Sequence, residues 1–133
     1  MIARLLIAVI SFGAGVMLAP KGFPVKEVII TERVEVPVVR EMTLEDLPLA
    51  WQKLAKCESS GRLDAVSGTR KQFQGAFQIE YPRTWVAHGG HSGTPPKKAT
   101  LKEQFHVALH IYADRGAKPW PYCGKFLKAE YGR

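Results

Sequence analysis

Apolar residues recur every three or four positions in the segment that follows residue 42. These apolar positions are Leu44, Leu47, Trp51, Leu54 and Ala55. This spacing predicts an amphipathic helix that begins after Thr43 as N-cap, runs to about Ser59 and ends near Gly61. Residues 61–75 are mostly polar and contain Gly68 and Gly75, which indicates a loop or a short hairpin.

A second helical stripe follows a capping box. Thr100 and Glu103 have the spacing of a box that starts a helix, and Gly116 is placed to end it. The apolar positions between them are Leu101, Phe105, Ala108, Leu109 and Tyr112. Shorter helices are predicted from Pro82 to His88 and over residues 124–129. The region 43–133 is therefore expected to be a small, mainly helical domain with little strand.

The first twenty residues have a different pattern. Arg4 precedes an uncharged, mostly apolar run at residues 5–19, which suits a signal peptide or a membrane anchor. A retained signal-anchor is favoured over cleavage, because a cut after Ala19 would have the large Met17 two positions before it and Pro20 directly after it. A buried helix is the third alternative. Arg4 on the cytoplasmic side places the rest of the chain outside. Residues 21–42 are rich in valine and isoleucine and contain two prolines, which predicts an extended linker or an edge strand.

Charge and chain length restrict the classes of function that the protein can have. The chain has 133 residues and a net charge of +7. Most of the basic excess lies in residues 43–133, with fourteen basic and eight acidic side chains. Such an excess favours an anionic partner: nucleic acid, an anionic membrane or an acidic cell wall. No nucleic-acid-binding motif and no phosphate-binding glycine loop is present, so neither nucleic acid nor a nucleotide cofactor is expected. The length excludes large barrels.

Two pairs of residues are candidates for cross-links or metal binding. Cys57 and Cys123 are the two cysteines, and an exported chain permits a disulfide between them; two buried free thiols are the alternative. His106 and His110 lie four residues apart, with Glu103 one turn earlier, a spacing compatible with zinc. The chain has no H-E-x-x-H motif, so two surface histidines are the favoured interpretation and no metal is expected.

Glu58 is the main candidate for acid chemistry. It stands at the end of the first amphipathic helix, where a carboxyl group tends to have a raised pKa. A protonated carboxyl group of this kind suits a general acid acting on a glycosidic oxygen. The other acids considered as partners lack comparable surroundings in the sequence; these are Asp64, Glu80, Glu103 and Asp114.

Three blocks of residues follow one another in a recognisable order. The first block is Trp51-Gln-Lys-Leu-Ala-Lys-Cys57-Glu58-Ser59-Ser60-Gly61. The second comprises Gly75-Ala-Phe-Gln78-Ile79, Thr84-Trp85 and His88-Gly89-Gly90, and the third is Trp120-Pro121-Tyr122-Cys123-Gly124. Together they resemble the resuscitation-promoting factor domain, a transglycosylase-like family with a lysozyme-like α+β fold, over about residues 50–130. Ser60 departs from the usual first glycine, Leu63 from an aromatic residue, and Arg115 from a frequent glutamine.

The resemblance implies roles for individual residues. Glu58 matches the single catalytic glutamate, and Cys57 and Cys123 match the family's disulfide. Residues that match the lining of the glycan cleft are Gln78, Thr84 and Trp85. Independently of the resemblance, Trp85, Trp120 and Tyr122 are candidates for stacking on sugars, and at least one of them is expected to pack in the core instead.

The resulting hypothesis is a peptidoglycan-cleaving glycosidase. It acts on the β-1,4 bond between N-acetylmuramic acid and N-acetylglucosamine, as a lytic transglycosylase with Glu58 as acid and base. A lysozyme-type hydrolase that uses water remains open. The alternatives are a non-catalytic peptidoglycan-binding module and a membrane-tethered phage lysis enzyme. The expected partners are glycan strands and, through residues 1–20, the cytoplasmic membrane. The expected location is the outer face of that membrane or the cell wall.

Overall fold

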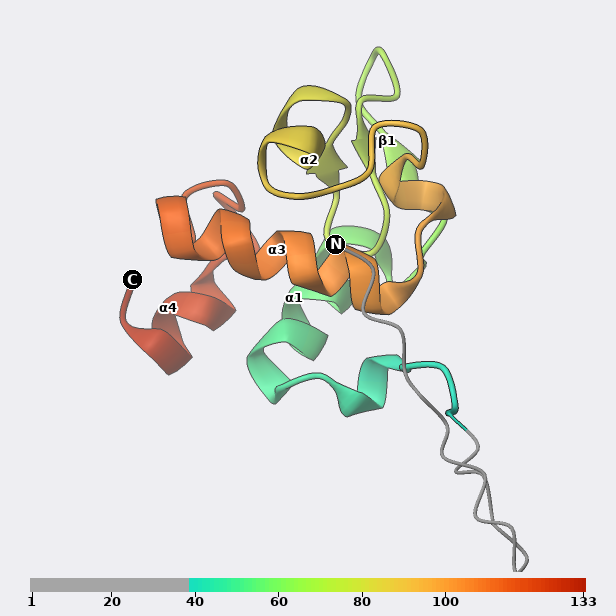
Figure 1. Ribbon diagram of the computed structural model, residues 1–133. Coiled ribbons are helices and arrows are strands. Elements are labelled where there is room, and N and C mark those ends of the chain that lie inside the picture. Colours follow the sequence, from blue (N-terminus) through green and yellow to red (C-terminus); the bar gives the residue numbers. More distant parts are fainter. Residues whose placement is uncertain (1–38) are drawn as a thin grey trace, which may run out of the picture. The chain divides into compact units, whose positions relative to one another are not determined.

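The computed structural model describes residues 39–133, which form a mainly helical domain with a small sheet (Figure 1). The α-helices are α1 (Leu49–Ser59), α2 (Arg83–Ala87), α3 (Leu101–Arg115) and α4 (Lys125–Tyr131). Two short 3₁₀ turns are η1 (Leu44–Asp46) and η2 (Pro96–Lys98), and the strands are β1 (Val66–Ser67), β2 (Phe73–Gln74) and β3 (Ile79–Glu80). The predicted fold class, mainly α with a short hairpin, is confirmed for this part of the chain.

The predicted membrane segment falls on other residues. Residues 1–20, and residues 21–38 of the predicted linker, lie outside the described residues, so both remain predictions. Between residues 39 and 133, no helix combines the length and the apolar character needed to cross a bilayer.

The first predicted helix is divided in two. Thr43 caps the turn η1 rather than α1, and Leu47 then adopts an extended backbone with φ −78° and ψ 153°. The prediction of one helix from Thr43 is wrong because Pro48 follows Leu47, and the ring of a proline disfavours helical geometry in the preceding residue. The helix α1 begins after Pro48 and ends where predicted, with Ser60 in the left-handed region.

The helix α3 begins and ends where predicted. The Thr100 hydroxyl accepts a hydrogen bond from the Glu103 amide at 3.3 Å, and the Glu103 carboxylate accepts one from the Thr100 amide at 2.8 Å. Gly116 follows the last turn with φ 62°. The predicted apolar stripe is wrong at Leu109, which is 40% exposed, because the buried face turns slightly to include Val107 and Ile111 instead.

The three strands form an antiparallel sheet in the order β1-β2-β3. Val66 pairs with Gln74, and Phe73 pairs with Glu80. This hairpin confirms the short hairpin predicted for residues 61–75. In Figure 1, α3 crosses the middle of the domain, with β1 and α2 on one side and α1 and α4 on the other.

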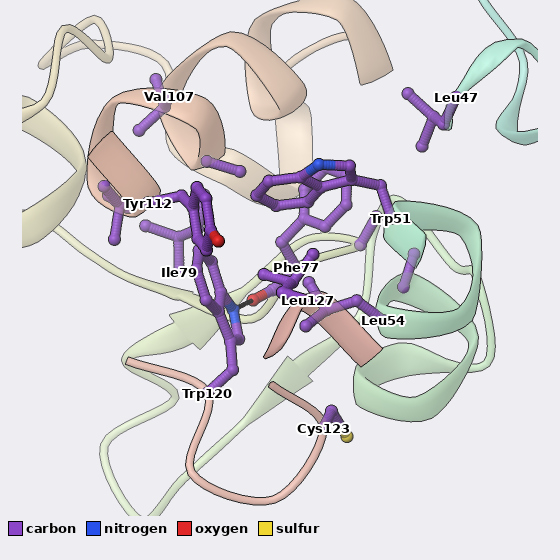
Figure 2. Packing of buried hydrophobic residues seen from close by; sticks show 14 of the residues in the cluster. Leu47, Trp51, Leu54, Phe77, Ile79, Val107, Tyr112, Trp120, Cys123 and Leu127 are labelled. Atoms are coloured by element: carbon purple, nitrogen blue, oxygen red, sulfur yellow. Dashed lines mark hydrogen bonds between the residues drawn. The ribbon is translucent and has the colours of Figure 1, made fainter. Parts of the chain in front are cut away.

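The core is built around Trp51 of α1, which is 2% exposed. Four aromatic rings meet its indole edge-on at centroid distances of 5.4–5.8 Å; they belong to Phe77, Phe105, Tyr112 and Trp120. Edge-to-face contacts of this kind add to the stabilisation from burial. Figure 2 shows Leu54 and Leu127 beside the same cluster, so α1 and α4 share the core with α3.

Candidate active site

Glu58 lies on the last turn of α1 and is half-buried. Burial raises the pKa of its carboxyl group, because removing water penalises the charged form. The chain turns sharply just after it, with Ser60 at φ 58° and Gly61 at φ 76°. The turn ends the helix at this carboxyl group, as the sequence predicted.

The residues on either side of Glu58 connect α1 to distant segments. Cys57 forms a disulfide with Cys123, with a Cα–Cα distance of 5.8 Å, so the predicted pairing is confirmed. On the other side, Ser59 Oγ lies 2.9 Å from the carbonyl oxygen of Ala76. These two connections hold the Glu58 backbone between the segment that contains Cys123 and the turn between β2 and β3.

The β2–β3 turn is also fixed from α3. The side-chain oxygen of Gln104, a fully buried residue, accepts a hydrogen bond from the Ala76 amide at 2.7 Å. Its nitrogen donates to the carbonyl oxygens of Leu63 and Ala99, both at 3.1 Å. Gly75 is required here, because a Cβ atom would lie 2.2 Å from the Gln104 oxygen and φ is +81°. The turn that presents Gln78 is therefore rigidly placed.

A cleft of about 160 Å³ opens beside this turn. Its lining residues are Phe73, Gln78, Ile79, Glu80, Thr84, Ile111, Arg115, Pro119 and Trp120. The structure thus brings together three of the five predicted substrate-binding residues, from the β2–β3 turn, from α2 and from the segment before Cys123. The Gln78 side chain accepts a hydrogen bond from Ser67 Oγ and donates one to the carbonyl oxygen of Gly75 at 2.9 Å.

The two predicted substrate-binding tryptophans are both buried. Trp85 is 1% exposed, and its indole N–H donates to the carbonyl oxygen of His91 at 3.1 Å. It lines a different cavity, of about 540 Å³. Trp120 is 3% exposed, and its N–H donates to the carbonyl oxygen of Phe77 at 2.8 Å (Figure 2). The expectation that at least one of the aromatic candidates packs in the core is confirmed.

Tyr122 is placed differently from the tryptophans. Its side chain is 76% exposed, one residue before the disulfide-bonded Cys123. The ammonium group of Lys125 lies 4.9 Å from the centroid of its ring. An exposed ring next to the disulfide is accessible to a ligand, so its predicted role in stacking remains a prediction.

Two charged residues that were not predicted to bind substrate, Glu80 and Arg115, also line the cleft. The pKa of Glu80 is lowered, chiefly by hydrogen bonding from Thr84, whose amide donates to the carboxylate at 2.7 Å. Gln78 lies in the β2–β3 turn with φ 49°, so strand alternation does not relate its side chain to that of Glu80, and no local pattern indicated Glu80.

The two histidines of α3 are not among the described residues that line this cleft. The rings of His106 and His110 have centroids 4.5 Å apart. Among residues 39–133, no group of three or more histidine, cysteine or acidic side chains is arranged to hold a metal ion.

Comparison with known proteins gives a family match over most of the described region. The family described as "Transglycosylase-like domain" matches residues 47–123. The chain is 38% identical over 74 residues to resuscitation-promoting factor RpfC from Mycobacterium tuberculosis, covering 56% of this chain and 49% of that protein. It is 35% identical over 78 residues to resuscitation-promoting factor Rpf1 from Corynebacterium glutamicum, covering 58% and 39%. The chain thus spans about half or less of the length of these relatives.

Proposed function

The chain belongs to the transglycosylase-like domain family, and we propose that it is a peptidoglycan-cleaving enzyme with Glu58 as its acid and base. The observation that carries the proposal is the environment of Glu58. Its pKa is raised by burial, whereas the pKa values of Glu80, Glu103 and Asp114 are lowered by hydrogen bonds. A protonated carboxyl group suits a proton donor and gives no benefit to a module that only binds glycan.

The proposed reaction has two proton transfers through one carboxyl group. The Glu58 carboxyl group donates its proton to the glycosidic oxygen while the bond from that oxygen to C1 of N-acetylmuramic acid breaks. The 6-hydroxyl group of the same sugar then attacks C1, which has oxocarbenium character, and its proton passes to the Glu58 carboxylate. The products are a strand with a 1,6-anhydro end and a strand with a free 4-hydroxyl group. The enzyme is regenerated with Glu58 protonated.

Hydrolysis is the second candidate, and Glu80 is the observation that favours it. A hydrolase of the two-carboxylate type needs an ionised carboxylate near the sugar in addition to the acid. Glu80 lines the cleft, and its lowered pKa keeps it ionised. In this alternative water replaces the 6-hydroxyl group and the new end is a reducing sugar.

Digestion of purified peptidoglycan by the full-length chain distinguishes these reactions. Mass analysis of the released fragments is expected to show 1,6-anhydro ends, which are one water lighter than reducing ends. Reducing ends alone would establish the hydrolase instead. The absence of any released fragment would contradict both enzymatic proposals and favour a binding module.

We further propose that the enzyme works outside the cytoplasmic membrane. The Cys57–Cys123 disulfide supports an oxidising compartment. Arg4 and the apolar run at residues 5–19 support an anchor with residues 43–133 on the outer side. Cell fractionation tests this: full-length protein in the membrane pellet, digested by protease added to spheroplasts, is expected. Soluble protein that begins near Lys21 would show cleavage, and protection from protease would contradict the orientation.

A further inference from the structure

Arg115 is the one basic side chain that lines the cleft within residues 39–133. It is the last residue of α3, and its side chain is 49% exposed. The lining also includes Gln78, Thr84 and Trp120, so a glycan that occupies this cleft comes within reach of a positive charge.

The hydrogen bonds around Arg115 engage only one edge of its guanidinium group. Its Nε donates to Asp114 Oδ2 at 3.3 Å. The same oxygen lies 3.2 Å from His88 Nε2. In the part of the chain that the structure describes, the two terminal nitrogens of Arg115 have no hydrogen-bond partner. These nitrogens form a planar fork that matches the two oxygens of a carboxylate.

The only other charged group lining the cleft, within residues 39–133, is Glu80. Its carboxylate accepts the Thr84 amide hydrogen at 2.7 Å, which attaches it to the start of α2. Arg115 lies near enough for its charge to help lower the pKa of Glu80, and a negatively charged ligand in the cleft is attracted by Arg115 and repelled by Glu80. A carboxylate that enters the cleft is therefore expected to lie next to Arg115 and away from Glu80.

We propose that Arg115 binds a carboxylate carried by the glycan, so that the cleft selects strands in which the muramic acid substituent has a free carboxylate. The proposal rests on the proposed function, because it names the substrate subclass of that cleft. Two sources share this chemistry. One is the lactyl carboxylate of strands without stem peptides, and the other is the glutamate carboxylate of the stem peptide.

The alternative role for Arg115 is structural, through its ion pair with Asp114. That pair is exposed, with side-chain exposures of 49% and 61%, and its distance is 3.3 Å. Exposed pairs of this kind contribute little to stability. Ligand selectivity and thermal unfolding therefore separate the two roles.

The test measures binding in the full-length Glu58→Gln chain, so that ligands are not consumed. The first two ligands are peptide-free glycan oligosaccharides with free lactyl carboxylates and the same oligosaccharides with these groups converted to methylamides. The second two are stem-bearing oligosaccharides with a free or an amidated glutamate carboxylate. In at least one pair, the charged ligand is expected to bind about tenfold more tightly. The pair that shows the difference identifies the source.

Second-site variants in this background assign the selectivity to Arg115. Adding Arg115→Gln is expected to reduce the affinity ratio to about one, and Arg115→Lys is expected to restore part of it. Lys128→Gln removes an equal charge from an exposed position of α4 and is expected to leave the ratio unchanged. Thermal unfolding of each variant verifies that it is folded.

Several outcomes would overturn the proposal. These are a ratio near one for both ligand pairs, a ratio that Arg115→Gln leaves unchanged, and an equal loss of ratio in Lys128→Gln. A preserved ratio together with no cleavage by the chain that retains Glu58 would support carboxylate binding by Arg115 and contradict the proposed enzymatic function instead.

Discussion

At the scale of single residues, Glu58 gives the chain a specific dependence on pH. A general acid must be protonated, so activity is expected to fall as the pH rises through the raised pKa of this group. Stability follows the same direction. Because the folded-state pKa lies above the unfolded value, the contribution of Glu58 is fully present below the unfolded pKa and is lost as the pH rises through the folded pKa.

The rate of peptidoglycan cleavage and the temperature of thermal unfolding, both measured over a pH series, test this expectation. We expect the cleavage rate of the wild-type chain to decline at alkaline pH. The decline is assigned to Glu58 if the unfolding temperature of Glu58→Gln no longer changes over the same pH range. A rate that increases through the same pH range would contradict the assignment of Glu58 as an acid.

Trp120 provides the second prediction for a single residue. Its indole N–H donates to the carbonyl oxygen of Phe77, and the side chain is 3% exposed. Trp120→Phe keeps an aromatic ring but leaves that carbonyl group without its donor, which costs about 1–3 kcal/mol. Urea unfolding is expected to show this loss. Tyr122→Phe is the matched control, because Tyr122 is exposed and should change stability little; equal stability of both variants would contradict the assignment of Trp120 to the core.

The sequence identified the type of these residues but not their burial. Trp85 and Trp120 were candidates for sugar binding and for the core alike, because an aromatic side chain suits both environments. Their burial depends on tertiary packing, of Trp120 against Trp51 of α1 and of Trp85 beside residues of α3, which no local pattern contains. Glu80 and Arg115 lie in different elements, and only the fold brings them to one cleft.

At the scale of elements, the capping box of α3 makes a measurable contribution. Thr100→Ala removes the hydroxyl group that accepts the Glu103 amide hydrogen, and it is expected to lower the free energy of unfolding by about 0.5–2 kcal/mol. Chemical denaturation measures the loss. Thr69→Ala, in the exposed loop between β1 and β2, is the control and is expected to change stability little. Equal effects of both substitutions would show that the box does not stabilise α3.

Local capping signals predicted both ends of α3 and the end of α1, but not the start of α1. The box at Thr100 and the glycine at Gly116 marked α3 correctly, because capping depends on residues that are near in sequence. The predicted first helix is too long at its start. Proline is tolerated in the first turn of a helix, but here Pro48 precedes that turn and Leu47 is extended, although the apolar period continues through it. Leu109 shows that a stripe read from the sequence can be rotated by tertiary packing.

At the scale of the whole molecule, the disulfide joins residues 66 positions apart. The Cys57→Ala/Cys123→Ala double variant is expected to lose about 2–5 kcal/mol of unfolding free energy. Reduction of the wild-type chain should produce a similar loss, and the double variant should not respond to the reductant. Equal stability of oxidised and reduced wild-type chain would contradict a stabilising role for this bond.

The same bond links stability to the candidate site. Glu58 follows Cys57 directly, and Trp120 lies three residues before Cys123. The site therefore combines segments from both ends of the matched region with the central hairpin. The resemblance identified these segments from their motifs, whereas their rigid connection through Gln104 and Ser59 became visible only in the fold.

Release of fragments from purified peptidoglycan by full-length Glu58→Gln tests the central claim most directly. Glu130→Gln is the matched control, because Glu130 is exposed on α4. Glu58→Gln keeps the size of the side chain but removes its proton, so the rate of release is expected to fall by a factor of about 10²–10⁴, while Glu130→Gln retains the wild-type rate. Near-wild-type release by folded Glu58→Gln would contradict the account.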